Sequence, residues 1–263
     1  MELFKNPGLN ILVDVGGSGV RIAPFSNGQI GTVRTCHIRS RQELYAEIRR
    51  TAGDRKIAGI AFSVAGFVDT RKGCVLRSAN ASYLEGDLAG DAKTALSVSK
   101  VRVVNDGEAH ARTLLLQDHV KFGAIHLALG TSVAFGVIGE NGQVLQTASG
   151  ENWDIGDMTM TTRSEHKEVW YLLGTHGLKE LEDSGSENPY FHFGCRLGTL
   201  LTQLAVIFRP RTIGLSGGIV TAHAADLKRG ILTDFHAPVC SEHPDIRLLT
   251  ETNTVMLGLT TLL

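Results

Sequence analysis

Several features are scarce in this 263-residue chain, and each absence excludes a class of protein. Aromatic residues make up only 6%, and the 26 Lys and Arg residues nearly balance the 27 Asp and Glu residues. Such a balance leaves no basic surface for the phosphates of DNA or RNA, so we expect no nucleic-acid partner. The apolar runs are short and interrupted, as in 124–138, so we expect no segment of the ~20 residues that span a bilayer.

Cysteine and histidine lack the spacing of common redox and metal sites. The four cysteines form no CxxC pair, and the ten histidines form no HxH or HExxH motif. Reduced structural thiols are the simplest interpretation; a zinc site built from neighbouring ligands is excluded, whereas a composite one stays open. The N-terminus has no signal-peptide pattern. Together these features predict a soluble cytoplasmic protein that does not act at a membrane.

Glycine is abundant, with 30 residues, and many of the glycines follow β-branched runs, which indicates strands that end in tight turns. The segment 10–23 has the pattern of an apolar strand, a glycine turn and a second strand, and the Asn-Gly at 27–28 is a strong hairpin signal. The same order recurs over 124–138, where Asn-Gly at 141–142 follows at the same spacing to within one residue. Two related halves are the natural interpretation, although two hairpins can also align by chance.

Helix and strand signals alternate in the rest of the chain. The segment 41–51 has apolar residues at helical spacing after Ser40, a typical N-cap residue. Apolar runs at 57–64, 101–104 and 212–215 indicate buried strands that end in glycine or polar residues. This alternation predicts an α/β protein, with sheets covered by helices.

The first glycine turn has the composition of a phosphate site. Asp14 stands at the end of the first strand, directly before the turn of Gly16, Gly17 and Ser18. Backbone N–H groups in such a turn can bind phosphate oxygens, and Asp14 can hold a magnesium ion through water. A plain hairpin with a solvated Asp explains the motif equally well. The second copy offers hydroxyl and N–H groups but no acid, in Gly130, Thr131 and Ser132.

Two further groups of acidic residues are candidates. Asp106 follows Asn105 at the end of an apolar run, where open α/β sheets place their ligand sites. A carboxylate there can accept the proton of a hydroxyl that attacks a γ-phosphate, and the alternative is an Asp that caps the next helix. Asp154 and Asp157 suit hydrogen bonding to a polyol, although a solvated loop explains them as well.

At this point the motifs resemble a known family. Asp14-x-Gly-Gly-Ser, Asn80, Asn105-Asp106, Gly130-Thr131, Asp154-Ile-Gly-Asp and Leu215-Ser-Gly-Gly occur in the order and approximate spacing of the ROK family of sugar kinases and repressors. The resemblance implies the two-lobed actin-like ATPase (ribonuclease H-like) fold, an α/β fold with duplicated βββαβα halves. The implied N-terminal lobe is 1–112 together with a C-terminal helix at 254–263, and the C-terminal lobe is 113–253. A partner surface is the alternative for 254–263.

The resemblance also implies a role for each motif. Asp106 matches the catalytic base, and Asn80, Asn105, Asp154 and Asp157 match residues that contact the sugar. Asp14, which we also expect to position magnesium, matches the first phosphate-binding hairpin. The expected ATP-binding residues are Asp14, Gly16, Gly17, Ser18, Gly130, Thr131, Gly217 and Gly218 from the resemblance, together with Ser132 from its hydroxyl group.

The chain departs from the family pattern at several points. Gly19 replaces a usual lysine, and Asp154 and Asp157 replace a Glu and a His. The second hairpin lacks the usual glycine run, and the cysteine cluster that binds zinc is missing, so we expect no structural zinc. These changes put the identity of the sugar in doubt.

The resemblance implies an ATP- and magnesium-dependent kinase for a hexose or an N-acylated hexosamine, of the glucokinase or N-acetylmannosamine kinase type. Its partners are a small sugar and ATP, and the family suggests a homodimer. A catalytically silent sensor of sugar or nucleotide is the alternative from another class. A repressor is not expected because few residues precede the first strand, and a pantoate-derivative kinase fits the motifs less well.

Overall fold

The computed structural model describes residues 8–17, 19–161, 166–238 and 242–263. These residues belong to two units, which we treat separately. Unit 1 comprises Met1–Thr113, Gln146–Asn152 and Val255–Leu263, and unit 2 comprises Leu114–Leu145 and Trp153–Thr254.

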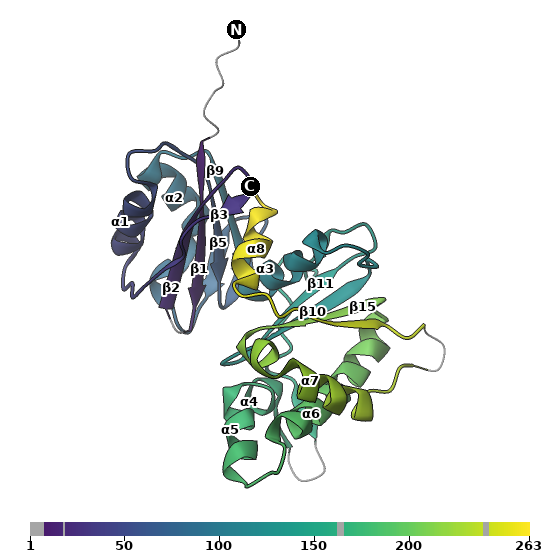
Figure 1. Cartoon of the computed structure of the whole chain (residues 1–263). Coiled ribbons are helices and arrows are strands. Elements are labelled where there is room, and N and C mark those ends of the chain that lie inside the picture. The colour runs from purple at the N-terminus through teal and green to yellow at the C-terminus, as the bar shows by residue number, and fades with distance from the viewer. Residues whose placement is uncertain (1–7, 18, 162–165, 239–241) are drawn as a thin grey trace. The chain divides into compact units, whose positions relative to one another are not determined.

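Unit 1 is built on a mixed sheet of the order β3-β2-β1-β5-β9, with β4 paired to β2 (Figure 1). Its strands are β1 (Leu9–Gly16), β2 (Gly19–Ser26), β3 (Gln29–Ile30), β4 (Arg34–Cys36), β5 (Ile57–Val64) and β9 (Lys100–Asn105). A small second sheet holds β6 (Phe67–Asp69), β7 (Cys74–Arg77) and β8 (Gly86–Asp87). Its helices are α1 (Arg41–Ala52), α2 (Leu88–Leu96) and α3 (Asp106–Arg112), and α8 (Thr254–Thr260) joins them with all but its first residue. A short 3-10 turn lies at Ser82–Leu84, and a second one, Thr113–Leu116, belongs to unit 2 in all but its first residue.

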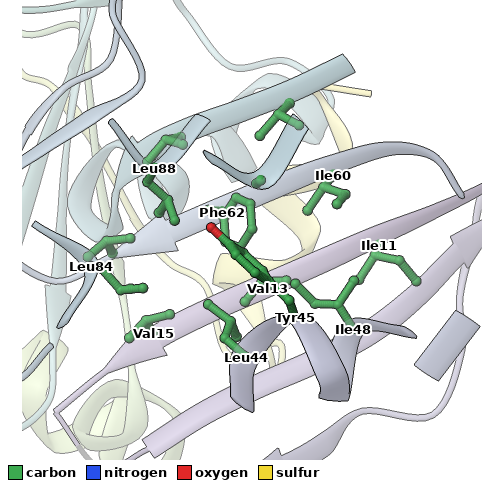
Figure 2. Close-up of a cluster of buried hydrophobic side chains, with 14 of the residues drawn as sticks. Ile11, Val13, Val15, Leu44, Tyr45, Ile48, Ile60, Phe62, Leu84 and Leu88 are labelled. Carbon is green, nitrogen blue, oxygen red and sulfur yellow. The ribbon is translucent and has the colours of Figure 1, made fainter. Parts of the chain in front are cut away.

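Strict alternation along β1 gives unit 1 a core on each face of its sheet. Figure 2 shows Ile11, Val13 and Val15 in one cluster with Leu44 and Ile48 of α1. Side chains of successive strand residues point to opposite faces, so the residues between these three lie on the other side. A second core covers that side, formed by Leu12, Ala23, Ala61, Val104, Ala109, Val255, Met256 and Leu259. The last three of these come from α8, which therefore completes unit 1.

Unit 2 repeats the arrangement with the strand order β12-β11-β10-β15-β16. The strands are β10 (Ala124–Leu129), β11 (Val133–Ile138), β12 (Val144–Leu145), β15 (Thr212–Ser216) and β16 (Asp245–Leu248), with a hairpin of β13 (Thr159–Thr161) and β14 (His166–Glu168) outside this sheet. The helices are α4 (Val169–Leu172), α5 (Thr175–Asp183), α6 (Pro189–Phe208) and α7 (Gly218–Asp234).

The two main sheets share one topology. In each, three strands pair antiparallel, and two more strands then add in parallel beside the first strand of that unit. The duplication inferred from the two hairpins is therefore present in the sheet order. Each sheet also carries a fifth strand, β9 or β16, beyond the βββαβα pattern.

The segment Gln146–Asn152 corrects the expected lobe boundary. The sequence assigned it to the C-terminal lobe with 113–253, whereas its contacts belong to unit 1. The Val68 amide donates to Asn152 Oδ1 at 3.0 Å, and Arg71 donates to the Ser149 carbonyl at 2.8 Å. These polar contacts fasten the segment to the β6 region, which no pattern in the segment itself indicates.

Helix α6 corrects a second expectation. It has 20 residues with a mean hydropathy of 1.3, so by length and composition alone it could cross a membrane. The sequence expectation that no segment reaches this length was wrong. However, Phe193, Leu197, Leu201 and Leu204 of α6 are buried in the core of unit 2, and core helices pass the same test.

Candidate functional site

The first glycine turn lies beside Asn80 in unit 1. The β1–β2 hairpin closes with Gly16 opposite Gly19, and Gly17 stands in the turn. A methyl group added to Gly17 would lie 3.3 Å from the side-chain nitrogen of Asn80, whereas one on Gly16 would meet no atom within 4 Å. Open space at a backbone turn is what a close approach by phosphate needs. Ser18, the remaining predicted residue of the turn, lies outside the described residues.

Asp14 is held by an arginine that the sequence analysis did not single out. The β1–β2 register places Asp14 opposite Arg21. The Arg21 Nε and Nη2 atoms donate to Asp14 Oδ2 at 2.9 and 2.6 Å. The side chain of Asp14 is 5% exposed and that of Arg21 is 36% exposed. The carboxylate is therefore buried beneath its cation.

The pair sits in a polar row across the second face of the sheet. Ser63 of β5 pairs with Asp14 in parallel register and is fully buried, and its hydroxyl has no hydrogen-bond partner among the described residues. His110 of α3 is close enough to Arg21 for the positive charge of the guanidinium to affect its titration. Burial, with a smaller effect of the Arg21 charge, lowers the pKa of His110 to about 3. The imidazole is therefore neutral at physiological pH.

Asn105 begins helix α3 and also fixes Asp106. Its Oδ1 accepts from the amides of Gly107 and Glu108, which makes Asn105, and not Asp106, the N-cap. Its Nδ2 donates to the Gly66 carbonyl and to Asp106 Oδ1, both at 2.8 Å. All four hydrogen-bonding positions of an amide side chain are thus used within unit 1. The side chain of Asn105 therefore orients Asp106.

Asp106 has the electrostatics of a general base. Oδ1 of its carboxylate accepts from Asn105 Nδ2 at 2.8 Å and from the Gly107 amide at 3.0 Å. Burial, and then the negative charge of Asp14, raises the pKa of Asp106 from 3.8 to about 7. A carboxyl group poised near neutrality is suited to accept and release a proton in catalysis.

The second turn lies beside a glycine-led helix in unit 2. Gly130 closes the β10–β11 turn by donating to the Ser132 carbonyl at 3.1 Å, and both Thr131 and Ser132 are exposed. Gly217, just before α7, has φ +102°, and a Cβ there would lie 2.3 Å from the Leu129 carbonyl oxygen. The turn and the start of α7 are therefore immediate neighbours.

Two glycines of this region leave room for a ligand. A Cβ on Gly130 or on Gly218 would meet no atom within 4 Å. Gly218 is the first residue of α7, which is interrupted by a kink at His223, and the unpaired N–H groups of this helix start face the space. Unit 2 therefore offers two sets of backbone donors, at the turn and at the helix start, that suit a nucleotide.

Asp154 and Asp157 also belong to unit 2, whereas Asn80, Asn105 and Asp106 belong to unit 1. Both aspartates are exposed. Asp154 Oδ1 accepts from the Gly156 amide at 2.7 Å, and the Gly156 carbonyl accepts from the Trp170 amide at 3.0 Å. The loop is therefore held in place, while its carboxylates remain open to solvent.

Asp14 of unit 1 does not fit the magnesium-binding role that the sequence analysis predicted for it. Magnesium is usually held by free carboxylate oxygens, but Arg21 already neutralises Asp14. Among residues 8–17, 19–161, 166–238 and 242–263, no group of three or more His, Cys, Asp or Glu side chains could hold a metal ion.

Known structures share this fold. No family model and no curated protein matches the chain. A ROK family protein from Streptococcus pneumoniae, solved with sucrose, superposes with a TM-score of 0.79 at 18% identity over 97% of each chain. A ROK family glucokinase from Streptomyces griseus, solved with glucose and AMPPNP, gives 0.76 at 16% identity over 97% of this chain and 99% of that one. A ROK family transcriptional regulator gives 0.77 at 16% identity, over 98% of this chain and 78% of its own.

These likenesses establish the fold. The chain has the actin-like ATPase fold of ROK family sugar kinases, as the resemblance in sequence predicted. The same fold occurs in a regulator, so activity has to be argued from the residues.

Proposed function

We propose that this chain, which has the fold of the ROK proteins, is an ATP-dependent kinase that phosphorylates a hydroxyl group of a hexose or an N-acylated hexosamine. One observation carries the proposal above the others. Asp106, with a pKa near 7, is oriented by Asn105 in the unit that also holds the Gly17 turn and Asn80. A proton acceptor next to a phosphate-binding turn is the arrangement that transfer from ATP to an alcohol requires.

In this mechanism Asp106 accepts the proton of the attacking hydroxyl through Oδ2, because Oδ1 is occupied by Asn105 and Gly107. Asn80 contacts the sugar beside the turn. Asn105, predicted from sequence as a sugar contact, acts as a positioning residue. Asp154 and Asp157 are proposed to bind sugar hydroxyl groups, and their exposure leaves their oxygens available.

Backbone groups are proposed to bind ATP. The open space at Gly16, Gly130 and Gly218 lets phosphate oxygens and the nucleoside approach the main chain. The proposed ATP-binding residues are Gly16, Gly17, Ser18, Gly130, Thr131, Ser132, Gly217 and Gly218. The magnesium ion enters with ATP as part of the substrate, and we assign Asp14 no role in holding it.

A panel of hexoses and N-acylated hexosamines with coupled detection of ADP tests the proposal. The expected result is ADP formation that depends on one sugar class and on ATP. The matched control is Asp54→Asn, which removes an exposed carboxylate of unit 1 and should keep full activity. ADP release at the same rate with and without every sugar would contradict the proposal.

A silent sensor is the second candidate, and the pairing of Asp14 with Arg21 favours it, because it removes an acidic group from the phosphate site. A protein of this fold is a transcriptional regulator, so loss of turnover is compatible with the fold. A thermal-shift screen of sugars with and without ATP separates the two candidates. A sensor shows a sugar-dependent shift in melting temperature without ADP release.

A further inference from the structure

The ion pair between Asp14 and Arg21 is built into the hairpin that carries the first phosphate turn. The two residues face each other across antiparallel strands, and two N–H groups of one guanidinium converge on one carboxylate oxygen. Arg21 lies two residues after Gly19, where the turn closes. The strand register therefore fixes a positive charge next to the turn.

Exposure differs between the two partners, and this decides which one a ligand meets. The Asp14 side chain is 5% exposed, whereas Arg21 is 36% exposed. A cation that approached Asp14 would have to displace Arg21 and leave that charge without its partner, which is costly for a buried pair. An anion that approached the turn would instead meet a guanidinium already held in position.

We propose that Arg21 is the fixed cation of the first phosphate turn and that Asp14 is its anchor, not a metal-binding residue. The inference rests on the proposed function, since it assigns the ligand as the polyphosphate of a nucleotide. Arg21 binds the phosphate oxygens through its guanidinium, which has five N–H donors and suits oxyanions. Asp14 acts as a positioning residue because it orients that group.

Binding without metal distinguishes this role from a metal site. A phosphate turn that depends on magnesium through Asp14 loses affinity in EDTA, whereas one with a resident guanidinium keeps it. The experiment therefore measures the dissociation constants of ADP and of inorganic tripolyphosphate by calorimetry, once in EDTA and once in magnesium, for the complete chain.

Four variants complete the design. Arg21→Gln removes the cation, Arg21→Lys keeps the charge, and Asp14→Asn removes the anchor charge while keeping its shape. Arg50→Gln is the matched control, because Arg50 forms an exposed pair with Glu47 on α1. A double variant, Asp14→Asn with Arg21→Gln, replaces Arg21→Gln if the single variant does not fold, since it leaves no buried unpaired charge.

The expected result in EDTA is binding by the wild type and a loss of about tenfold or more in Arg21→Gln, the magnitude of a hydrogen bond to a charged group. Arg21→Lys restores part of the affinity. Asp14→Asn should lose less affinity than Arg21→Gln and lose it equally in both buffers, because it loosens the two hydrogen bonds that orient the guanidinium without removing the cation.

Two results would overturn the inference and leave the proposed function intact. One is unchanged affinity of Arg21→Gln in EDTA while the wild type binds. The other is a loss in Asp14→Asn that occurs only in magnesium. Failure of the wild type to bind either ligand in both buffers would overturn the proposed function together with this inference.

Discussion

The β1–β2 and β10–β11 hairpins have the same topology but differ in the pair of side chains that face each other across the strands at one equivalent position. Three residues before Gly17, Asp14 of β1 faces Arg21 of β2. Three residues before Gly130, Leu127 of β10 faces Phe135 of β11, and both side chains are buried. One position of the duplicated frame thus carries an ion pair in unit 1 and an apolar pair in unit 2.

This difference shows that the hairpin fold does not require an ion pair at this position. An apolar pair closes the equivalent hairpin, and burying an ion pair costs desolvation that its own attraction often fails to offset. The charged pair therefore suggests a functional role in unit 1. The acid Asp106 belongs to the same unit, whereas the described turn residues of unit 2 are neutral. Under the proposed function, unit 1 supplies the charged residues that take part in catalysis, and unit 2 supplies backbone groups that bind the nucleotide.

The largest expected effect tests this assignment of chemistry to unit 1. Asp106→Asn should lower sugar-dependent ADP formation by about 10³-fold, because a general base contributes on this order. Nucleotide affinity should stay near that of the wild type, since Asn retains the oxygen that accepts from Asn105 and Gly107. The coupled ADP assay measures the rate. Turnover within threefold of the wild type would remove Asp106 from the mechanism.

The pH dependence should follow the same acid. Because the base form of Asp106 is needed and its pKa is about 7, kcat/KM should fall about tenfold per pH unit below 7. The free energy of unfolding should depend on pH in the opposite direction to kcat/KM. The folded state holds the proton that the unfolded chain releases above pH 3.8, so the free energy of unfolding falls as pH rises toward 7.

Asp106→Asn isolates both effects. The variant should lack this loss of stability, and thermal melts at pH 5 and pH 8 compare the two proteins directly. A rate that stays flat between pH 5 and pH 7 would contradict the assignment.

In unit 2 we expect substitutions of backbone glycines, and not of charged residues, to change stability and ADP binding. Gly217→Ala places a Cβ 2.3 Å from the Leu129 carbonyl at φ +102°, which should cost about 3 kcal/mol of unfolding free energy. Gly218→Ala is the control next to it, because its Cβ meets nothing within 4 Å. Urea denaturation checks both. Gly218→Ala should unfold like the wild type but bind ADP less tightly; equal stability of the two variants would contradict the predicted close approach.

The smallest effect concerns the pair itself. Replacing Asp14 by Leu and Arg21 by Met together should change the free energy of unfolding by about 1 kcal/mol or less, because an apolar pair suits this position in unit 2. Asp14→Leu alone should be less stable than the double variant. Denaturation of the three proteins measures the coupling. A collapse of the double variant would show that the ion pair is needed for folding.

Local patterns were enough to predict the α/β class and the two hairpins, and the resemblance to the ROK family supplied the actin-like fold, whereas the roles of the candidate residues remain predictions. Glycine turns after β-branched runs mark strand ends, so the two hairpins and their repetition were visible without coordinates. Arg21 was missed because its role depends on register. The signal was present, since a hairpin that closes at Gly16 and Gly19 places residues 14 and 21 opposite each other. The N-cap role of Asn105 was missed because hydrogen-bond partners depend on tertiary placement.

Two predictions about the organisation of the chain, the lobe boundary and the length of the apolar segments, differed from the structure because they depend on tertiary contacts and on whole-helix composition. Nothing in the composition of 146–152 marks it as part of unit 1, because its attachment comes from Asn152, Ser149 and a bridge between Glu151 and Asp69. Helix α6 was not recognised as long enough to span a membrane because apolar and polar residues mix along it.

Helix α8 has a consequence for how the protein is made. Val255, Met256 and Leu259 cover the face of the sheet formed by Leu12 and Ala61, which are translated well before them. That face stays uncovered during translation until the chain has been synthesised past Leu259. Unit 1 therefore reaches its final packing only after unit 2 has been translated, and a premature stop before α8 exposes an apolar surface to chaperones and proteases.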